Sequence, residues 1–409
     1  MTVKERCEEI LQGKPLLKLP VSGGVEAALP TAEPTAEPSV TPAAPTPEPI
    51  PEETEEPEAE EEAAPVEIVE EEDGSKSVRV GRLRFHSTDT ALDLSSLSAS
   101  QLEELFPVLE EMPRLESVKL PASVRFETVG RVQQLPSQPL VDYRFSLYGK
   151  EFSTADPSMN LNAVPIGDNG EALRAVLPYM TNCSMVEMER CGLRYVTYAA
   201  IRDEFPERGI VWRVDFGGYS VRTDETRILA SIKGYNLTGE KCAVLKYCTK
   251  VRYLDLGHNI IDDISFVEYM PDLEVAILAI NYWSDASPLA SCKKLEYLEI
   301  FNTRCTDLSP LSELTNLKHL NVCWIKELRD ISPLYNLTGL ERLWIGCVNQ
   351  VPKEQLEEIR ERLPNTTINT TTDNPTSEGW RKDPRYDLLS EQLGYHWVQP
   401  YSTPSGPVK

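Results

Sequence analysis

Residues 307–320 read DLSPLSELTNLKHL, and residues 330–343 read DISPLYNLTGLERL. Nearly the same stretch therefore recurs 23 positions further along the chain (330 − 307). A structural unit that cannot bury its own apolar side repeats in this way, because it must stack on a neighbour of the same shape. The doubled stretch therefore predicts an array of stacked coils.

The array extends on both sides of the doubled stretch. Aligned on leucine, units begin at residues 251, 273, 295, 317 and 340, so the period is 22 with one extra residue in the fourth unit. Apolar residues fill positions 1, 4 and 6 of each unit, as Leu295, Leu298 and Ile300 do. Positions 4 and 6 alternate as in a short strand, and the Ser-Pro-Leu block suits a capped helical turn. A single amphipathic helix is excluded by the period and by the recurring proline.

The unit L-x-x-L-x-L-x-x-N-x-I-x-D-I-S-P-L resembles the bacterial, internalin-like class of leucine-rich repeats over residues 251–364. The resemblance implies an α/β solenoid, with a curved parallel sheet and short helices on its convex side. The asparagine that caps the turn in that class is present as Asn259 and Asn281 and becomes Thr303 in the third unit. The extra residue displaces it in the fourth unit, where we expect a bulge near Trp324.

A longer period precedes these coils. Residues 105–120, 173–188 and 241–256 match at a spacing of 68 (173 − 105 and 241 − 173). Between them, residues 80–90, 143–156 and 212–225 alternate around a glycine, which predicts β-hairpins. We therefore predict hairpin–helix–strand repeats over residues 76–250, a pattern that resembles modules of bacterial cell-surface proteins.

The two ends of the chain differ from its centre in composition. Residues 30–75 are rich in Pro and Glu, which predicts a disordered acidic linker. Residues 1–29 are predicted to be a short N-terminal segment; either it holds a docking helix, or the protein begins further upstream. Charges in residues 1–20 interrupt the apolar stretch that a signal peptide needs. Residues 365–409 are predicted to form a C-terminal cap or arm over the last coil.

The charge and the motifs of the chain argue against several classes of function. The net charge is −24, of which 17 come from residues 19–75, and no basic block is present, which argues against nucleic acid. No run of eighteen apolar residues predicts a membrane span. The nine cysteines form no CxxC pair, and no catalytic motif occurs. We predict no catalytic, cofactor-binding or metal site, and hence no enzyme. The repeated aspartates read as turn caps, with calcium on the turn edge as the alternative; they are Asp262, Asp263, Asp285, Asp307 and Asp330.

Positions 3, 5 and 7 of each unit flank the buried positions and are predicted to point to the concave face. They are rich in aromatic residues and include arginine, which are the residue types that anchor interfaces. The predicted partner-binding residues are Tyr253, Asp255, Ile277, Tyr297, Glu299, Phe301, His319, Asn321, Arg342 and Trp344. The alternative is that the hairpins or the C-terminal arm cover this face. Replacing Tyr297 and Trp344 by alanine is expected to abolish binding without lowering the melting temperature, whereas a loss of stability would indicate an internal face.

These patterns favour a non-enzymatic binding module that recognises a protein, with a glycan as a second ligand class. The linker resembles stalks that present such modules, so display at a bacterial cell surface is expected. An intracellular scaffold that docks through its N-terminal segment is the alternative, and the many unpaired cysteines suit a reducing interior.

Overall fold

The computed structural model describes residues 64–230 and 236–370. All of them belong to one compact unit. The predictions for residues 1–29, for most of the linker and for the arm after residue 370 therefore lie outside the described residues. Within the described ranges, no helix has both the length and the apolar character needed to cross a membrane.

The described chain begins with an antiparallel sheet in the order β1-β2-β3. Its strands are β1 (Val66–Glu70), β2 (Lys76–Val80) and β3 (Leu83–His86). The prediction of a disordered linker up to residue 75 is wrong for β1. Two opposite-charge pairs face each other across this ladder, Glu67 with Arg79 and Glu70 with Lys76, and such pairs stabilise antiparallel strands. The acidic character of the segment therefore contributes to pairing instead of preventing it.

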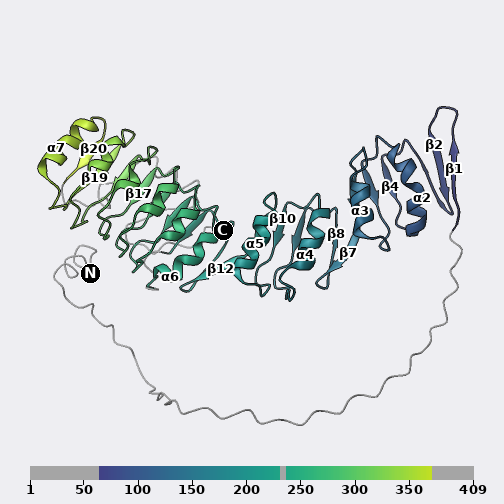
Figure 1. Ribbon diagram of the computed structural model, residues 1–409, viewed down its shortest axis with the longest axis horizontal. Coiled ribbons are helices and arrows are strands. Elements are labelled where there is room, and N and C mark those ends of the chain that lie inside the picture. Colours follow the sequence, from purple (N-terminus) through teal and green to yellow (C-terminus); the bar gives the residue numbers. More distant parts are fainter. Residues whose placement is uncertain (1–63, 231–235, 371–409) are drawn as a thin grey trace, which may run out of the picture. The chain divides into compact units, whose positions relative to one another are not determined.

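Two similar modules follow, each with three parallel strands, two helices and a hairpin (Figure 1). The first contains β4 (Ala91–Asp93), α2 (Ala99–Glu110), β5 (Ser117–Lys119), α3 (Phe126–Gln133), β6 (Leu140–Asp142), and the hairpin β7 (Arg144–Leu147) and β8 (Lys150–Ser153). The second contains β9 (Ser158–Asn160), α4 (Glu171–Val176) with η1 (Leu177–Tyr179), β10 (Met185–Glu187), α5 (Tyr195–Glu204), β11 (Gly209–Val211), and the hairpin β12 (Arg213–Phe216) and β13 (Tyr219–Arg222).

The 68-residue spacing is visible in these modules. Val118, Val186 and Leu254 occupy the middle of β5, β10 and β15 (Tyr253–Asp255), and all three are buried. The modules contain more than the one helix and one strand that the sequence predicted, because α3 and α5 add a second helix to each. The three predicted hairpins are present, turning at Gly81, at Gly149 and at Gly217–Gly218, which adopt positive φ angles.

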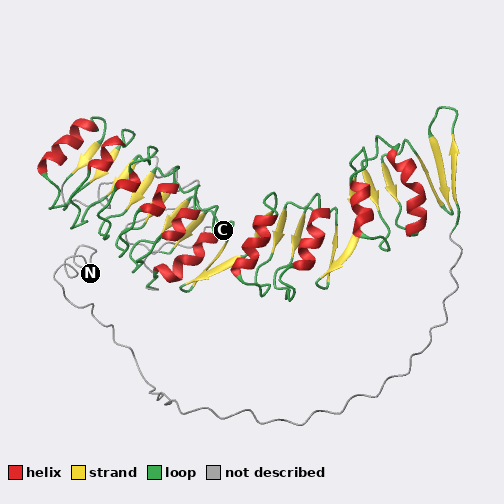
Figure 2. Cartoon of the chain, viewed as in Figure 1, coloured by secondary structure: helices red, strands yellow, loops and turns green. Residues whose placement is uncertain are grey.

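The last module is a seven-stranded parallel sheet in the order β14-β15-β16-β17-β18-β19-β20. Figure 2 shows its helices and helical turns on one side of the strands. The strands are β14 (Arg227–Leu229), β15 (Tyr253–Asp255), β16 (Val275–Ile277), β17 (Tyr297–Glu299), β18 (His319–Asn321), β19 (Arg342–Trp344) and β20 (Thr367–Asn369). The helical segments are α6 (Gly239–Cys242), η2 (Ala243–Tyr247), η3 (Ser265–Tyr269), η4 (Ser287–Ser291), η5 (Ser309–Leu311), η6 (Ser332–Asn336) and α7 (Lys353–Arg362).

This architecture confirms the predicted fold class, a leucine-rich repeat solenoid preceded by longer helix–strand–hairpin repeats. Neighbouring strands pair in one constant register, with Leu254, Ala276, Leu298, Leu320 and Leu343 opposite one another. Residues at positions 1, 4 and 6 belong to one continuous core that the helical turns also line. The sheet begins at residue 227 and ends at residue 369, so it extends beyond the predicted range of 251–364 on both sides.

Every coil turns at position 8, where the backbone is left-handed. The φ angles are +60° at His258, +53° at Ile280, +53° at Asn302, +61° at Trp324 and +57° at Cys347. This conformation costs a non-glycine residue about 1 kcal/mol. Each N–H from position 8 of the first four coils donates to a carbonyl of the next coil, as Trp324 does to Gly346 at 3.0 Å. The predicted bulge near Trp324 is wrong, because the extra residue leaves both this turn and the strand pairing unchanged.

Asparagine at position 9 completes the turn. The Asn281 side chain accepts a hydrogen bond from the N–H of Ile261 at 2.9 Å. Its amide donates to the carbonyls of Leu256 and Leu278, so one side chain joins two coils. Thr303 replaces it in the third unit and keeps only a bond to the carbonyl of Ile300.

Candidate recognition surface

The seven-stranded sheet has apolar side chains on both faces. Opposite the main core, the side chains at positions 3, 5 and 7 form a second apolar cluster, which we call the aromatic ladder. Its buried members are Tyr253, Val275, Ile277, Tyr297, Cys323 and Trp344, and Leu229, Phe301 and Trp324 pack against them. The ladder exists because the constant strand register places equivalent positions of successive coils side by side.

Aromatic rings stack along one part of the ladder. The ring of His319 on β18 lies between the rings of Tyr297 on β17 and Trp344 on β19. The centroid of His319 is 5.7 Å from that of Tyr297 and 6.1 Å from that of Trp344. These are normal separations for interacting rings. The three strands therefore present one contiguous aromatic surface.

Polar groups lie between the rings. The carboxylate of Glu299 accepts a hydrogen bond of 2.6 Å from the Tyr297 hydroxyl, and Asp255 accepts one of 3.1 Å from the N–H of Gly257. Asn321 accepts from the N–H of Cys323 at 3.1 Å, and within the described residues its buried side-chain NH₂ group has no acceptor. Because leaving a buried amide unpaired costs free energy, the Asn321 NH₂ group favours a ligand that supplies an acceptor.

The structure brings all ten predicted binding residues onto this one face. Nine lie on the strands, and Phe301 follows the end of β17. Eight of the ten are buried, with Tyr253 at 0% exposure and Trp344 at 4%, while Phe301 and Arg342 are half-buried. The face is therefore not an open surface in this structure, and its role in partner binding stays a prediction.

The repeated aspartates act as caps. The carboxylate of Asp307 accepts hydrogen bonds from both the N–H and the hydroxyl of Ser309, at 2.9 Å and 2.5 Å. Asp285 makes the same pair of bonds to Ser287, and Asp330 accepts from the N–H of Ser332. These bonds hold the pKa of each of the three aspartates below its usual value. The carboxylates of Asp285, Asp307 and Asp330 thus cap backbone N–H groups at the turns, as the capping interpretation predicted.

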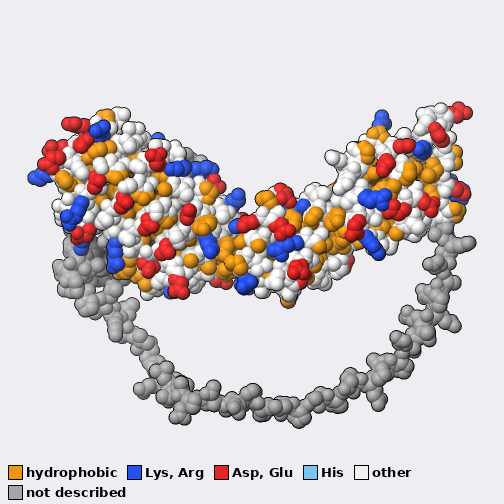
Figure 3. Space-filling view, in the orientation of Figure 1, with side chains coloured by type: hydrophobic (Ala, Val, Ile, Leu, Met, Phe, Trp, Pro, Cys, Tyr) orange, Lys and Arg blue, Asp and Glu red, His pale blue; other side chains and the backbone are white. Residues whose placement is uncertain are grey.

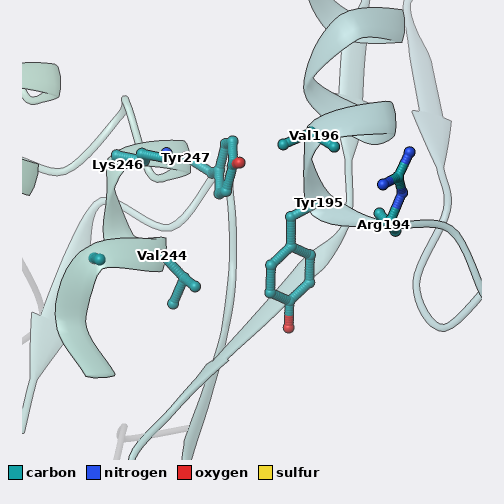
Figure 4. A pocket seen from close by; sticks show the side chains of 7 residues that line it. Arg194, Tyr195, Val196, Val244, Lys246 and Tyr247 are labelled. Carbon is teal, nitrogen blue, oxygen red and sulfur yellow. The ribbon is translucent and has the colours of Figure 1, made fainter. Parts of the chain in front are cut away.

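A second surface, which sequence reasoning missed, is a groove of about 380 Å³ between α5 and η2. Figure 4 shows Tyr195 and Val196 on one side of it and Val244 and Tyr247 on the other. The rings of Tyr195 and Tyr247 approach to 6.0 Å, and Val196 is 55% exposed. No sequence signal marks this groove, because α5 and η2 belong to different repeats.

On the face shown in Figure 3, acidic and basic side chains are interspersed over the described residues.

The fold and the ladder define a leucine-rich repeat solenoid. No family model matches the chain. The chain is 38% identical over 96 residues to cilia- and flagella-associated protein 410 of Mus musculus, a match that covers 23% of this chain and 39% of that protein. It is 35% identical over 77 residues to the Homo sapiens protein of the same name, covering 19% and 30%. The chain therefore matches less than half the length of these curated relatives.

Solved structures with a similar arrangement include two internalins from Listeria monocytogenes. The internalin inlF has 20% identity and a TM-score of 0.31, with 66% of each chain covered. The internalin C2 has 15% identity and a TM-score of 0.30, with 69% of this chain and 80% of that one covered. A leucine-rich repeat protein of Leptospira interrogans has 15% identity and a TM-score of 0.28, with 64% and 50% covered. With TM-scores this low, the assignment of the fold rests on the 22-residue coil itself.

Proposed function

We propose that this chain is a non-enzymatic binding module that recognises a protein partner through the aromatic ladder. The observation that carries the proposal is the ladder itself, which places aromatic residues together with Arg342 on the face away from the core. A contiguous cluster of apolar side chains on the face away from the main core is typical of an interaction site. Tyr, Trp and Arg are the residues that contribute most to protein interfaces. A protein ligand with apolar side chains and a backbone carbonyl that accepts a hydrogen bond from the side-chain NH₂ group of Asn321 fits this surface.

The test uses a matched pair of arginine substitutions. Arg342 is half-buried on the ladder, whereas Arg304 is exposed and packs on the ring of Tyr282, 4.7 Å from its centroid. The full chain is used to capture proteins from the source organism, and captured proteins are quantified by mass spectrometry. We expect Arg342→Ala to lose a specific protein at least tenfold while Arg304→Ala retains it. Equal capture by both variants contradicts binding through the ladder. Purified partner is then titrated into each variant to give its Kd.

We further propose that the module is displayed at a bacterial cell surface. The support is the Pro- and Glu-rich composition of residues 30–63, which is typical of extended stalks, together with the internalin-like repeat unit. An epitope tag placed in the β7–β8 turn at Gly149, where no atom lies within 4 Å of an added Cβ, serves as a reporter. Labelling by antibody on intact cells supports display, and labelling only after lysis contradicts it.

An intracellular scaffold is a second candidate, favoured by the cysteines. The described residues contain eight free cysteines, of which only Cys347 is not fully buried. Unpaired thiols are typical of proteins that work in a reducing compartment. In that case residues 1–20 are the docking segment. Deleting them then removes a partner that the Arg342→Ala variant still captures.

A further inference from the structure

The aromatic ladder is more deeply buried than its own sheet can explain. Neighbouring strands lie about 4.8 Å apart and cover a side chain on two flanks, but not on the side that points away from the sheet. Tyr253 is nevertheless 0% exposed, Tyr297 3% and Trp344 4%. Strands β15, β16, β17 and β18 each have three residues, and all three are buried in every one of these strands. Only the middle residue of each strand points to the main core; the outer two point away from it. A further segment must therefore lie over this face.

We propose that residues 371–409 of the same chain occupy the aromatic ladder, so that a protein partner must displace them. The position of this segment supports the assignment, because it follows β20, the terminal strand of the same sheet. Six strand spacings of about 4.8 Å span roughly 29 Å, which about nine extended residues can cross. The segment supplies 39 residues (409 − 370), so it can reach every strand of the ladder.

Composition distinguishes this segment from the N-terminal one. Residues 371–409 contain Trp380, Tyr386, Tyr395 and Trp397, and these rings suit an apolar surface lined by aromatic side chains. Residues 30–63, by contrast, contain no aromatic residue. A segment of that composition has little apolar area to bury and therefore gains little from lying on the ladder.

Charge points to the same segment. The ladder holds two buried carboxylates, Asp255 at 2% exposure and Glu299 at 1%. A buried carboxylate requires donors or cations, and three cations are grouped in residues 381–385 as Arg381, Lys382 and Arg385. Residues 30–63 carry Glu and no Lys or Arg, so they would bring like charge to this face. The C-terminal segment therefore offers both aromatic rings and a group of cations, whereas residues 30–63 offer neither.

Photocrosslinking in the full chain identifies the occupant directly. The photoreactive amino acid p-benzoylphenylalanine replaces Tyr297, an aromatic ladder residue, and in a second variant Phe301, which is half-buried and tolerates the larger side chain more easily. The matched control carries it in place of Tyr282, which is 49% exposed. After irradiation, the crosslinked peptides are identified by mass spectrometry.

We expect both ladder positions to crosslink to peptides from residues 371–409 within one chain, with at least tenfold less of this product from position 282. Crosslinks to residues 1–63, crosslinks to a second copy of the chain, or none at all from either ladder position overturn the assignment. Only the competition with a partner rests on the proposed function. If the arm crosslinks but the Arg342→Ala variant binds its partner normally, the arm assignment stands and the function proposed for the ladder fails.

Discussion

At the scale of single residues, the stacking of coils depends on positions where no side chain fits. Gly239 begins α6, and a Cβ added there would lie 2.9 Å from the backbone nitrogen and oxygen of Asp263 in the next coil. Backbone atoms cannot move away without shifting the coil. The N–H of Gly239 also donates to the Asp262 carboxylate at 3.0 Å, so the close approach is itself hydrogen-bonded.

We therefore expect Gly239→Ala to destabilise the protein by about 1–3 kcal/mol, the usual cost of overpacking. Gly167→Ala is the matched control, because a Cβ there meets nothing within 4 Å and its φ angle is not positive. The unfolding free energy of the control variant is expected to lie within about 1 kcal/mol of the wild-type value and above it. Urea unfolding followed by circular dichroism measures both values. Equal effects of the two substitutions would show that the coils adjust to the added methyl group.

Because of the buried thiols, the unfolding free energy falls at alkaline pH. Burial raises the pKa of the Cys305 thiol to about 12, from the usual 9.0 of a cysteine thiol, and it raises the pKa values of Cys242, Cys248 and Cys323 to about 12 as well. The unfolded chain therefore releases these protons at lower pH than the folded chain. The stabilisation is fully present below pH 9 and is lost as the pH rises toward 12.

For one thiol the loss amounts to about 1.4 kcal/mol per pH unit between these values. Cys305→Ala removes one such group, so the fall in unfolding free energy between pH 9 and pH 10.5 becomes shallower by about that slope. The cavity left by the substitution lowers stability at every pH and does not affect this difference. Urea titrations in reducing buffer at several pH values give both slopes. Parallel curves for wild type and variant contradict the assignment of the pH dependence to Cys305.

At the scale of elements, ion pairs join the second hairpin to the sheet before it. Arg222 on β13 donates to Glu187 on β10 and to Glu189, at 3.0 Å and 3.1 Å, and its guanidinium also pairs with Asp224. Hydrogen bonds to these carboxylates raise the pKa of the guanidinium further, so the charge is present at every working pH. One cation thus holds three carboxylates together between two repeats.

We expect Arg222→Gln to lower the unfolding free energy by about 1–3 kcal/mol, because the carboxylates then repel one another and lose charged donors. Arg329→Gln is the matched control, since Arg329 and its partner Glu327 are 74% and 68% exposed and such pairs contribute about 0–1 kcal/mol. Thermal unfolding at low and high salt provides the measurement. The Arg222 effect should shrink with added salt, and an effect no larger than that of the control would show that the network is not important for stability.

The sequence predicted those elements whose pattern repeats. The strands of the 22-residue coils, the helical turns at Ser-Pro-Leu and the three hairpins followed from spacing and from glycine positions. Helix α3 was not predicted, because it is only eight residues long, has no side-chain cap and buries only Val129 and Val132. Strand β1 was assigned to the linker because its composition is acidic, whereas its order comes from pairing with β2. Both misses concern short elements that neighbouring segments stabilise.

At the scale of the whole molecule, the spacing of positions 3, 5 and 7 predicted which residues share the second face of the sheet. It did not determine whether that face is open, because alternation in a strand reports only that two faces differ. The burial of Tyr297 and Trp344 depends on a segment that local sequence pattern does not identify. The burial also changes the expected result of replacing them, since a buried ring contributes to stability as well as to binding.

We therefore expect the combined Tyr297→Ala and Trp344→Ala variant to lose about 3–8 kcal/mol of unfolding free energy, since each large-to-small change in a core costs several kcal/mol and the two share His319 as a neighbour. The matched control replaces Tyr269 and Tyr282 by alanine; these residues are 50% and 49% exposed, so each change should cost at most about 1 kcal/mol. Urea unfolding of the full chain measures both variants. If the ladder variant unfolds at the wild-type urea concentration, the ladder is an open recognition face and residues 371–409 do not cover it. A loss confined to the ladder variant means that these side chains stabilise the resting protein, as buried rings do.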